Sequence, residues 1–316
     1  MRRRIVTLSV GCFLGWAGSV AGQEGQAVAQ MGVESGPKVV VLGTGTPNAD
    51  PERSGPAVAI VFENRAYLVD AGPGVVRRAA AAAEAEGIEA LEPPGLNRLF
   101  LTHLHSDHTL GLPDLILTPW VLERPDPIQV VGPPGTEEMV QHILRGWRQD
   151  INMRLFGLEP RGENPQAYRA PVDETEGGLV LDDGAVRVTA IPVLHANWEY
   201  AFGYRFEAGG QVIVVSGDAR PSENLVEACN GCDVLVHEVY STAGFQTRPP
   251  DWQEYHASAH TSTAELAELA NRAQPKLLVL YHQLYWGTTD DDLIQELRDA
   301  GYEGAVVSAS DLGVYP

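Results

Sequence analysis

Apolar residues recur along this chain in short runs, and these runs predict many β-strands. The expected strands are residues 39–42, 58–62, 67–69, 98–102, 128–131, 185–194, 200–206, 211–215, 234–237 and 276–281. Helices are expected at residues 75–86, 109–117, 136–147, 223–229, 263–272 and 290–299. Residues 149–177 show no clear period, which indicates a long surface loop or bridging segment. Strands with interspersed helices in both halves suggest two packed sheets with helices outside them.

The first residues have the pattern of an export signal. Three arginines at positions 2–4 precede an apolar run from Ile5 to about Val20, and small residues follow before the polar Gln23. We therefore expect a signal peptide at 1–22, a flexible leader at 23–37, one folded domain at 38–316, and a periplasmic or secreted protein. A membrane anchor is the alternative, but glycines and serines make the run short and weakly apolar, so no stable membrane span is expected after signal removal.

Composition and charge narrow the choice of partners. The chain has 316 residues, 44% of them hydrophobic, and a formal net charge of −20. Because phosphate backbones are bound by Lys and Arg that displace counterions, this charge argues against nucleic acid and favours a small-molecule substrate. A homodimer is left open. Cys229 and Cys232 are expected to be structural, and whether they form a disulfide is also left open.

The strongest chemical signal is the hexapeptide HLHSDH at residues 103–108, directly after a predicted strand. Side chains at i and i+2 of an extended segment point the same way, so His103 and His105 can bind one cation together. Asp107 and His108 follow on the turn, where they can present ligands to a second cation. The alternative is a chance run of surface histidines, but four metal-type ligands within six positions favour a metal site.

This hexapeptide resembles the signature of the metallo-β-lactamase superfamily. Five other segments resemble the branch that contains ribonuclease Z and arylsulfatase-like hydrolases, namely residues 42–47, 69–72, 132–136, 216–218 and 280–282. The resemblance extends from about Lys38 to the end of the chain. It implies an α+β fold, a four-layer αββα metallo-β-lactamase-type sandwich.

The resemblance also implies a zinc site with two Zn²⁺ per chain. One ion would be held by His103, His105 and His195, the other by Asp107, His108 and His282, with Asp218 as the bridge. His195, Asp218 and His282 stand at the tips of predicted strands, where sites on layered α/β folds gather. A bridging carboxylate favours phosphodiesterase-like and lactonase-like branches, whereas true β-lactamases of the superfamily typically lack it. The all-His/Asp set suits zinc hydrolysis.

Two further residues match supporting positions in the family. Asp70 matches an aspartate that supports a ligand histidine, and the alternative is a turn aspartate before Gly72. His260 matches a histidine that assists at the scissile phosphate in ribonuclease Z relatives, and the alternative is a solvated residue ahead of a helix cap. His237 and Glu238 are either structural or orient His260.

These residues together predict an exported, metal-dependent hydrolase. A water shared by two zinc ions would have its pKa lowered to about 7 and attack as a metal-bound hydroxide. Asp107 would accept a proton, and His260 would donate one to the leaving group.

Small esters, lactones or phosphodiesters are the preferred substrates, because of the export signal and the acidic charge. The alternative is a ribonuclease Z-like phosphodiesterase that processes RNA, although the chain has no evident basic arm for clasping tRNA. A non-catalytic metal-binding scaffold is a third alternative, but no ligand is missing. Six aromatic residues near the ligands either wall an apolar pocket or belong to the core: Trp198, Tyr200, Trp252, Tyr255, Tyr285 and Trp286.

Overall fold

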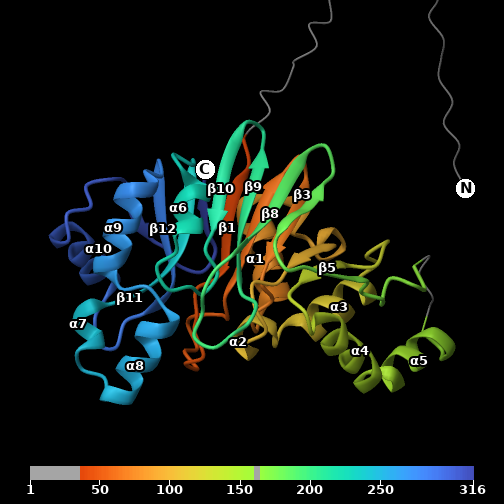
Figure 1. Ribbon diagram of the computed structural model, residues 1–316. Helices are drawn as coiled ribbons and strands as arrows, with labels where there is room; N and C mark the ends of the chain where they lie inside the picture. Colours follow the sequence, from red (N-terminus) through yellow and green to blue (C-terminus); the bar gives the residue numbers. More distant parts are fainter. Residues whose placement is uncertain (1–35, 160–163) are drawn as a thin grey trace, which may run out of the picture. The chain divides into compact units, whose positions relative to one another are not determined.

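Two seven-stranded sheets run through the computed structural model, which describes residues 36–159 and 164–316 (Figure 1). The first has the order β14-β1-β2-β3-β4-β5-β6 and the second the order β13-β12-β11-β10-β9-β8-β7. The strands of the first sheet are β1 (Lys38–Gly43), β2 (Ala57–Phe62), β3 (Arg65–Val69), β4 (Arg98–Phe100), β5 (Gln129–Gly132), β6 (Val172–Glu174) and β14 (Gly313–Tyr315). Those of the second are β7 (Gly178–Asp182), β8 (Val186–Pro192), β9 (Phe202–Ala208), β10 (Gln211–Val215), β11 (Val234–Tyr240), β12 (Leu277–Leu284) and β13 (Val306–Ser308).

Helices cover the outer face of each sheet. On the first sheet these include α1 (Val75–Glu86), α3 (Leu112–Val121) and α4 (Thr136–Gly146), and on the second α6 (Glu223–Cys229), α9 (Thr263–Ala273) and α10 (Asp290–Asp299). The remaining α-helices are α2 (Ser106–Thr109), α5 (Arg148–Phe156), α7 (Thr242–Phe245) and α8 (Pro250–Ala259). Among the described residues no helix has the length and apolar character needed to cross a membrane.

The side-chain alternation of the strands explains the layers. In β1, Val39 and Val41 pack between the two sheets, whereas Val40 and Leu42 pack against the helices on the outer face. Both faces of this strand are therefore buried, which is why it is apolar throughout rather than at every second position. The result is the expected α+β arrangement of four layers, αββα.

Each sheet has an antiparallel half and a parallel half. The neighbours β3 to β6 in the first sheet and β10 to β13 in the second are parallel. Loops that leave the carboxyl ends of parallel strands share one edge of a sheet, where binding sites of such folds tend to lie. The segments after β4 and after β10 carry five of the seven predicted ligands, so this topology places most of the site.

Residues 149–177 differ from the expected long loop. They contain most of α5 and the short strand β6, and β7 begins at Gly178. The strand β6 extends the first sheet beside β5, and its side chains are half-buried or exposed. A sheet-edge strand of this kind needs no apolar pattern, so the periodicity of the sequence does not reveal it.

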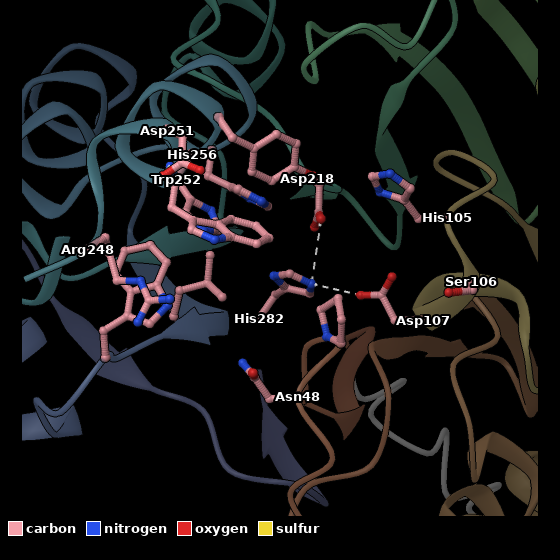
Figure 2. Close-up of a pocket in the computed structure, with 15 residues that line it drawn as sticks. Asn48, His105, Ser106, Asp107, Asp218, Arg248, Asp251, Trp252, His256 and His282 are labelled. Atoms are coloured by element: carbon pink, nitrogen blue, oxygen red, sulfur yellow. Dashed lines mark hydrogen bonds and ion pairs between the residues drawn. The ribbon is translucent and has the colours of Figure 1, made fainter.

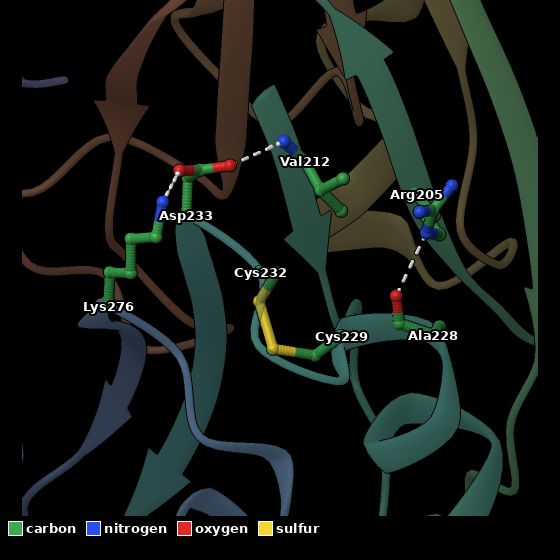
Figure 3. The surroundings of a disulfide bond; sticks show 7 residues. All are labelled: Arg205, Val212, Ala228, Cys229, Cys232, Asp233 and Lys276. Carbon is green, nitrogen blue, oxygen red and sulfur yellow. Dashed lines mark hydrogen bonds and ion pairs between the residues drawn. A yellow bond between two sulfur atoms is a disulfide. The ribbon is translucent and has the colours of Figure 1, made fainter. Parts of the chain in front are cut away.

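A disulfide bond joins Cys229, at the end of α6, to Cys232, in the turn before β11 (Figure 3). Both cysteines are buried among the apolar residues beneath α6 and α9. Next to the turn, Asp233 accepts hydrogen bonds from the Lys276 ammonium at 2.7 Å and from the backbone N–H of Val212 at 2.8 Å. The disulfide therefore closes the connection between a helix and a central strand. The expected signal peptide, 1–22, and nearly all of the expected leader, 23–37, lie outside the described residues.

Gly217 is required by its surroundings as well as by its conformation. Its φ is +61°, and a Cβ there would lie 2.6 Å from the carbonyl oxygen of Phe202 and 2.9 Å from Cβ of Thr102. We predict that Gly217→Ala lowers the free energy of unfolding by about 1–3 kcal/mol from backbone strain alone, with the clash adding to that loss. Urea denaturation measures the change.

Gly184→Ala is the matched control for this prediction. Gly184 also has a positive φ, +85°, but nothing lies within 4 Å of its added Cβ. We expect a smaller loss for Gly184→Ala, because only backbone strain is introduced. Equal losses in the two variants would contradict the role assigned to the packing around Gly217.

Candidate active site

The structure brings all seven predicted metal ligands together. Three sets of side chains each offer ligand atoms that lie within 4.8 Å of one another. The sets are His103, His105, His195 and Asp218; Asp107, His108 and His282; and Asp218, His260 and His282. Residues separated by up to 179 positions in the chain therefore meet at one place between the two sheets, and His260 joins them.

Three imidazoles converge in the first set. His103 Nε2 lies 2.9 Å from His105 Nδ1, and His195 Nε2 lies 3.2 Å from the same nitrogen. Asp218 Oδ2 lies 4.0 Å from His195 Nε2. The side chains of His103 and His105 point the same way, as the extended segment after β4 predicts.

The second set shares Asp218 with the first. His282 Nε2 lies 3.3 Å from Asp107 Oδ2 and 3.5 Å from Asp218 Oδ2. His108 Nε2 lies 3.5 Å from Asp107 Oδ2 and 3.4 Å from Asp218 Oδ2. Asp218 therefore stands between the two groups of imidazoles, and Figure 2 shows its carboxylate facing His282 and Asp107 across the pocket.

In three of these rings Nε2 faces the other ligands, and Nδ1, on the other side of the ring, has a partner of its own. His195 Nδ1–H donates to the backbone carbonyl of Ala259 at 2.8 Å, which leaves Nε2 unprotonated in the neutral ring. His103 Nδ1 lies 2.9 Å from Thr102 Oγ1, and His108 Nδ1 lies 2.8 Å from Asp70 Oδ2. Such partners set the tautomer and the orientation of a ligand histidine.

Asp70 is the common partner behind this arrangement. Besides His108, its carboxylate accepts the Thr102 N–H at 2.8 Å and the Thr102 hydroxyl at 2.9 Å. The Thr102 hydroxyl also lies next to His103, so Asp70 orients His108 directly and His103 through one intermediate. Its position agrees with the supporting role that the resemblance implies. Thr102 was not among the predicted site residues, although its place directly before the hexapeptide could have indicated it.

A β-bulge directs His282 into the site. In the pairing of β12 with β11, Tyr281 is opposite Glu238 and Gln283 is opposite Val239, so His282 is an extra residue. Its φ is +47°, in the left-handed region that few residues other than glycine adopt. We expected the strand to end at Tyr281, but it continues to Leu284. A bulge re-aims a side chain without ending the strand, which is the physical reason for the difference.

Burial keeps most of the ligand imidazoles neutral. Desolvation lowers the pKa of His105 and of His195 to about 4. It also holds the pKa of His103 well below its usual value. Burial acts in the same direction on His108, but the carboxylates of Asp218 and Asp70 outweigh it and raise the pKa of that ring. A neutral imidazole is the form that binds a metal ion.

The residues fit a divalent cation. Asp218 Oδ1 and His108 Nε2 are buried and have no hydrogen-bond partner within the part of the chain that the structure describes. Buried polar atoms without partners are rare, and an ion is one of the few explanations for them. Imidazole nitrogens together with carboxylate oxygens are the donor set that zinc and similar metals prefer.

His260 lies beside the ligands rather than at the surface. Its ring is stacked near that of His282, with centroids 5.9 Å apart, and its Nδ1 lies 3.4 Å from Glu238 Oε2. Glu238 is completely buried, and its other oxygen accepts the N–H of Thr261 at 2.9 Å. Neither Glu238 Oε2 nor His260 Nδ1 has a hydrogen-bond partner among the described residues, so the orientation of His260 by Glu238 stays a prediction. Burial lowers the pKa of His260 to about 4.

A cavity of about 640 Å³ opens onto these groups. Of the six aromatic residues named from the sequence, Trp252, Tyr255 and Trp286 line it. Trp198 and Tyr200 line a separate hollow, and the indole nitrogen of Trp198 lies 2.9 Å from His105 Nε2. His256 lines the main cavity. His142 is exposed on α4, away from the site.

Comparisons with known proteins agree with this geometry. A family model described as a beta-lactamase superfamily domain matches residues 65–283. The ribonuclease Z of Mycobacterium bovis (strain BCG / Pasteur 1173P2) is 34% identical over 283 residues, covering 87% of this chain and 96% of that protein. The ribonuclease Z of Mycobacterium sp. (strain KMS) is 36% identical over 252 residues, covering 78% of this chain and 84% of that protein.

Solved structures share the fold. Human tRNase Z, short form, has a TM-score of 0.63 at 23% identity, covering 88% of this chain and 98% of that chain. The metallo-beta-lactamase fold protein YhfI from Bacillus subtilis has a TM-score of 0.67 at 17% identity, covering 89% of this chain and 99% of that chain. The expected metallo-β-lactamase-type αββα sandwich is confirmed.

The relatives contradict two expectations. The preference for small esters, lactones or phosphodiesters over RNA, and the exclusion of a nucleic-acid partner, are both wrong, since the matched relatives are named ribonuclease Z. Both expectations rested in part on the net charge of the whole chain, and the preference for small substrates also rested on the export signal and the lack of a basic arm. A substrate, however, meets only the residues around the site. This chain belongs to the beta-lactamase superfamily, in its ribonuclease Z branch, and is a metal-dependent hydrolase.

Proposed function

We propose that this protein is a ribonuclease Z-type phosphodiesterase that cleaves phosphodiester bonds of RNA. The observation that carries the proposal is the identity of 34% with a ribonuclease Z along 96% of that relative's length. The convergence of imidazoles and carboxylates around Asp218 supports it, because this donor set would hold metal cations. Phosphoryl transfer requires such positive charge next to the oxygens of the reacting phosphate.

Two zinc ions would be held in this site. His103, His105 and His195 would bind one, Asp107, His108 and His282 the other, and Asp218 would contact both. The distances between the donor atoms and the burial of the rings support this assignment. The ions would supply Lewis-acid stabilisation of the negative charge that develops on the phosphoryl oxygens.

Asp107 would act as the proton acceptor of the reaction and His260 as the proton donor. The hydrogen bond from His282 and the nearby imidazoles hold the pKa of the Asp107 carboxyl low despite its burial, so this group is ionised and can accept a proton from the attacking water. His260 Nδ1 lies 3.4 Å from Glu238 Oε2, and His260 lines the cavity where the leaving oxygen would lie. Because burial lowers the pKa of His260 to about 4, the ring would take up a proton only beside the negative charge of the bound phosphate, and it would then donate that proton to the leaving oxygen.

We also propose that the enzyme acts outside the cytoplasm, in the periplasm or as a secreted protein. The charge and apolar pattern of the first 22 residues supports export. The disulfide between Cys229 and Cys232 supports an oxidising compartment, since most cytoplasmic thiols are kept reduced.

The substrate class can be tested with purified, zinc-loaded protein. We predict cleavage of a precursor tRNA with a 3′ extension and of bis-p-nitrophenyl phosphate, both reduced to background by a chelator and restored by Zn²⁺. A lactone and nitrocefin should remain intact. Hydrolysis of the lactone or of nitrocefin without cleavage of either phosphodiester would contradict the proposal.

The ligand assignment can be tested by substitution and metal analysis. We predict that His103→Ala abolishes turnover and lowers the bound metal, because a direct ligand is lost. Asp70→Asn keeps the shape of the side chain but removes its charge, so metal affinity or activity should fall by about 10–100-fold. Elemental analysis and activity on bis-p-nitrophenyl phosphate give the two measurements.

His142→Ala is the control for that series. Its exposed ring lies 2.8 Å from the backbone carbonyl oxygen of Glu138, on its own helix. Metal content and activity should stay at the wild-type values. Full activity and full metal content in His103→Ala would refute the assignment of that residue as a ligand.

Export can be tested by fractionation of cells that express the full-length chain. We predict that the protein accumulates outside the cytoplasm with its amino terminus near Gln23, as measured by intact mass. A full-length protein that stays in the cytoplasm with Cys229 and Cys232 reduced would contradict the proposal.

A further inference from the structure

One wall of the cavity next to the metal ligands is aromatic. Figure 2 shows Trp252 and His256 on one side of the pocket and Asp218, His282 and Asp107 facing them. Trp252 and His256 belong to α8, which the proposed hydrolytic mechanism does not use. At about 640 Å³, the space between them is large enough for a nucleotide-sized ligand.

The aromatic side chains of this wall are not part of the hydrophobic core. Trp252 is 49% exposed and Tyr255 is 37% exposed, and their rings lie at right angles with centroids 5.8 Å apart. The ring of His256 stacks on that of Trp252, with centroids 5.6 Å apart and planes inclined by 25°. The centroid of the His256 ring lies 4.5 Å from that of the Trp286 ring. The packing holds Trp252 in place while a large apolar surface stays open to solvent.

Polar atoms without partners accompany these rings. His256 is 8% exposed, and its Nδ1 has no hydrogen-bond partner among the described residues. Arg248 Nε is also buried and without a hydrogen-bond partner among the described residues, and the Arg248 guanidinium lies 5.7 Å from the centre of the Trp286 ring. Arg248 is also the one Arg or Lys that lines this cavity in the described part of the chain. Buried polar atoms beside an open aromatic surface indicate a ligand with a flat face and a polar edge.

We propose that Trp252 and Tyr255 form a stacking site for a nucleobase next to the scissile phosphate, with His256 and Arg248 facing its polar edge or its sugar-phosphate. This inference rests on the proposed function and names the substrate feature that the site binds. A base would gain contact area and stacking on Trp252 while its phosphate lies among the metal ligands on the opposite side of the cavity.

The side chains around the cavity favour this form of recognition. Because Arg248 is the one Arg or Lys that lines the cavity in the described part of the chain, a row of contacts between basic side chains and the phosphate backbone is not available there. Stacking of a base on an aromatic ring does not depend on surface charge and tolerates any base, because every base has a π face. The aromatic wall therefore supplies affinity for RNA that does not depend on basic side chains.

The experiment compares ligands with and without a base. Hydrolysis of methyl p-nitrophenyl phosphate by the zinc-loaded protein provides an assay with a small methyl group in place of a nucleoside. Adenosine 3′-monophosphate, adenosine 5′-monophosphate and ribose 5-phosphate are then measured as competitive inhibitors. For the wild type we expect the better adenosine monophosphate to bind about tenfold tighter than ribose 5-phosphate, which is the lower part of the range for stacking on one aromatic residue.

The variant Trp252→Ala should remove most of this preference and bring the ratio of the two inhibition constants close to one. Trp147→Ala is the matched control, because Trp147 is also 49% exposed but lies at the junction of α4 and α5. It should keep the wild-type ratio. A wild-type ratio near one, or a Trp252→Ala variant that keeps the full ratio, would overturn the stacking site.

The assay separates this inference from the proposed function. If the wild type hydrolyses methyl p-nitrophenyl phosphate without any preference for the adenosine monophosphates, the stacking site is refuted while phosphodiesterase chemistry stands. If neither methyl p-nitrophenyl phosphate nor precursor tRNA is cleaved, the proposed function itself fails, and the stacking site fails with it.

Discussion

The contact between the buried carboxylate of Asp70 and the histidines of the hexapeptide is the constraint on which the site depends. Asp70 follows β3, yet its oxygens hold His108, Thr102 and, through Thr102, His103. Its φ of +63° is a conformation that an aspartate adopts only at a cost of about 1–3 kcal/mol. The surrounding hydrogen bonds offset that strain, and they fix the orientation of the two rings.

In the second sheet, a glycine turn and a β-bulge, rather than a buried carboxylate, position the predicted ligands. Gly217 turns the chain after β10 where no other side chain fits, and the bulge at His282 rotates one residue of β12 out of the strand pattern. Asp218 and His282 thus reach the hexapeptide from the opposite sheet. A small shift between the sheets would change every distance between donors of opposite sheets, so the apolar packing between the sheets, which includes Val41 and Val215, is as necessary to the site as the ligands are.

Much of this site was predictable from the sequence because its strongest signal is local. The hexapeptide shows its spacing directly, and strand tips locate His195 and Asp218. The bulge at His282 was not predictable, because a bulge depends on the pairing partner and not on the strand's own residues. The helix α8 was missed for a related reason. It begins at Pro250 and buries only His256 and Ala259, so it has no apolar stripe to reveal it.

The error about nucleic acid has a more general cause. Net charge is a sum over all residues, but salt largely screens the repulsion between a polyanion and exposed charges that lie more than about 8–10 Å from it. At contact distance the local groups decide. Here these include the imidazoles of His105 and His195, which burial keeps neutral, carboxylates that a cation would neutralise, and Arg248 beside an aromatic wall. An acidic chain can therefore bind RNA through metal coordination and stacking, at the expense of the long-range attraction that a basic surface provides. The expected consequence is slow, weakly steered association followed by retention through close contacts.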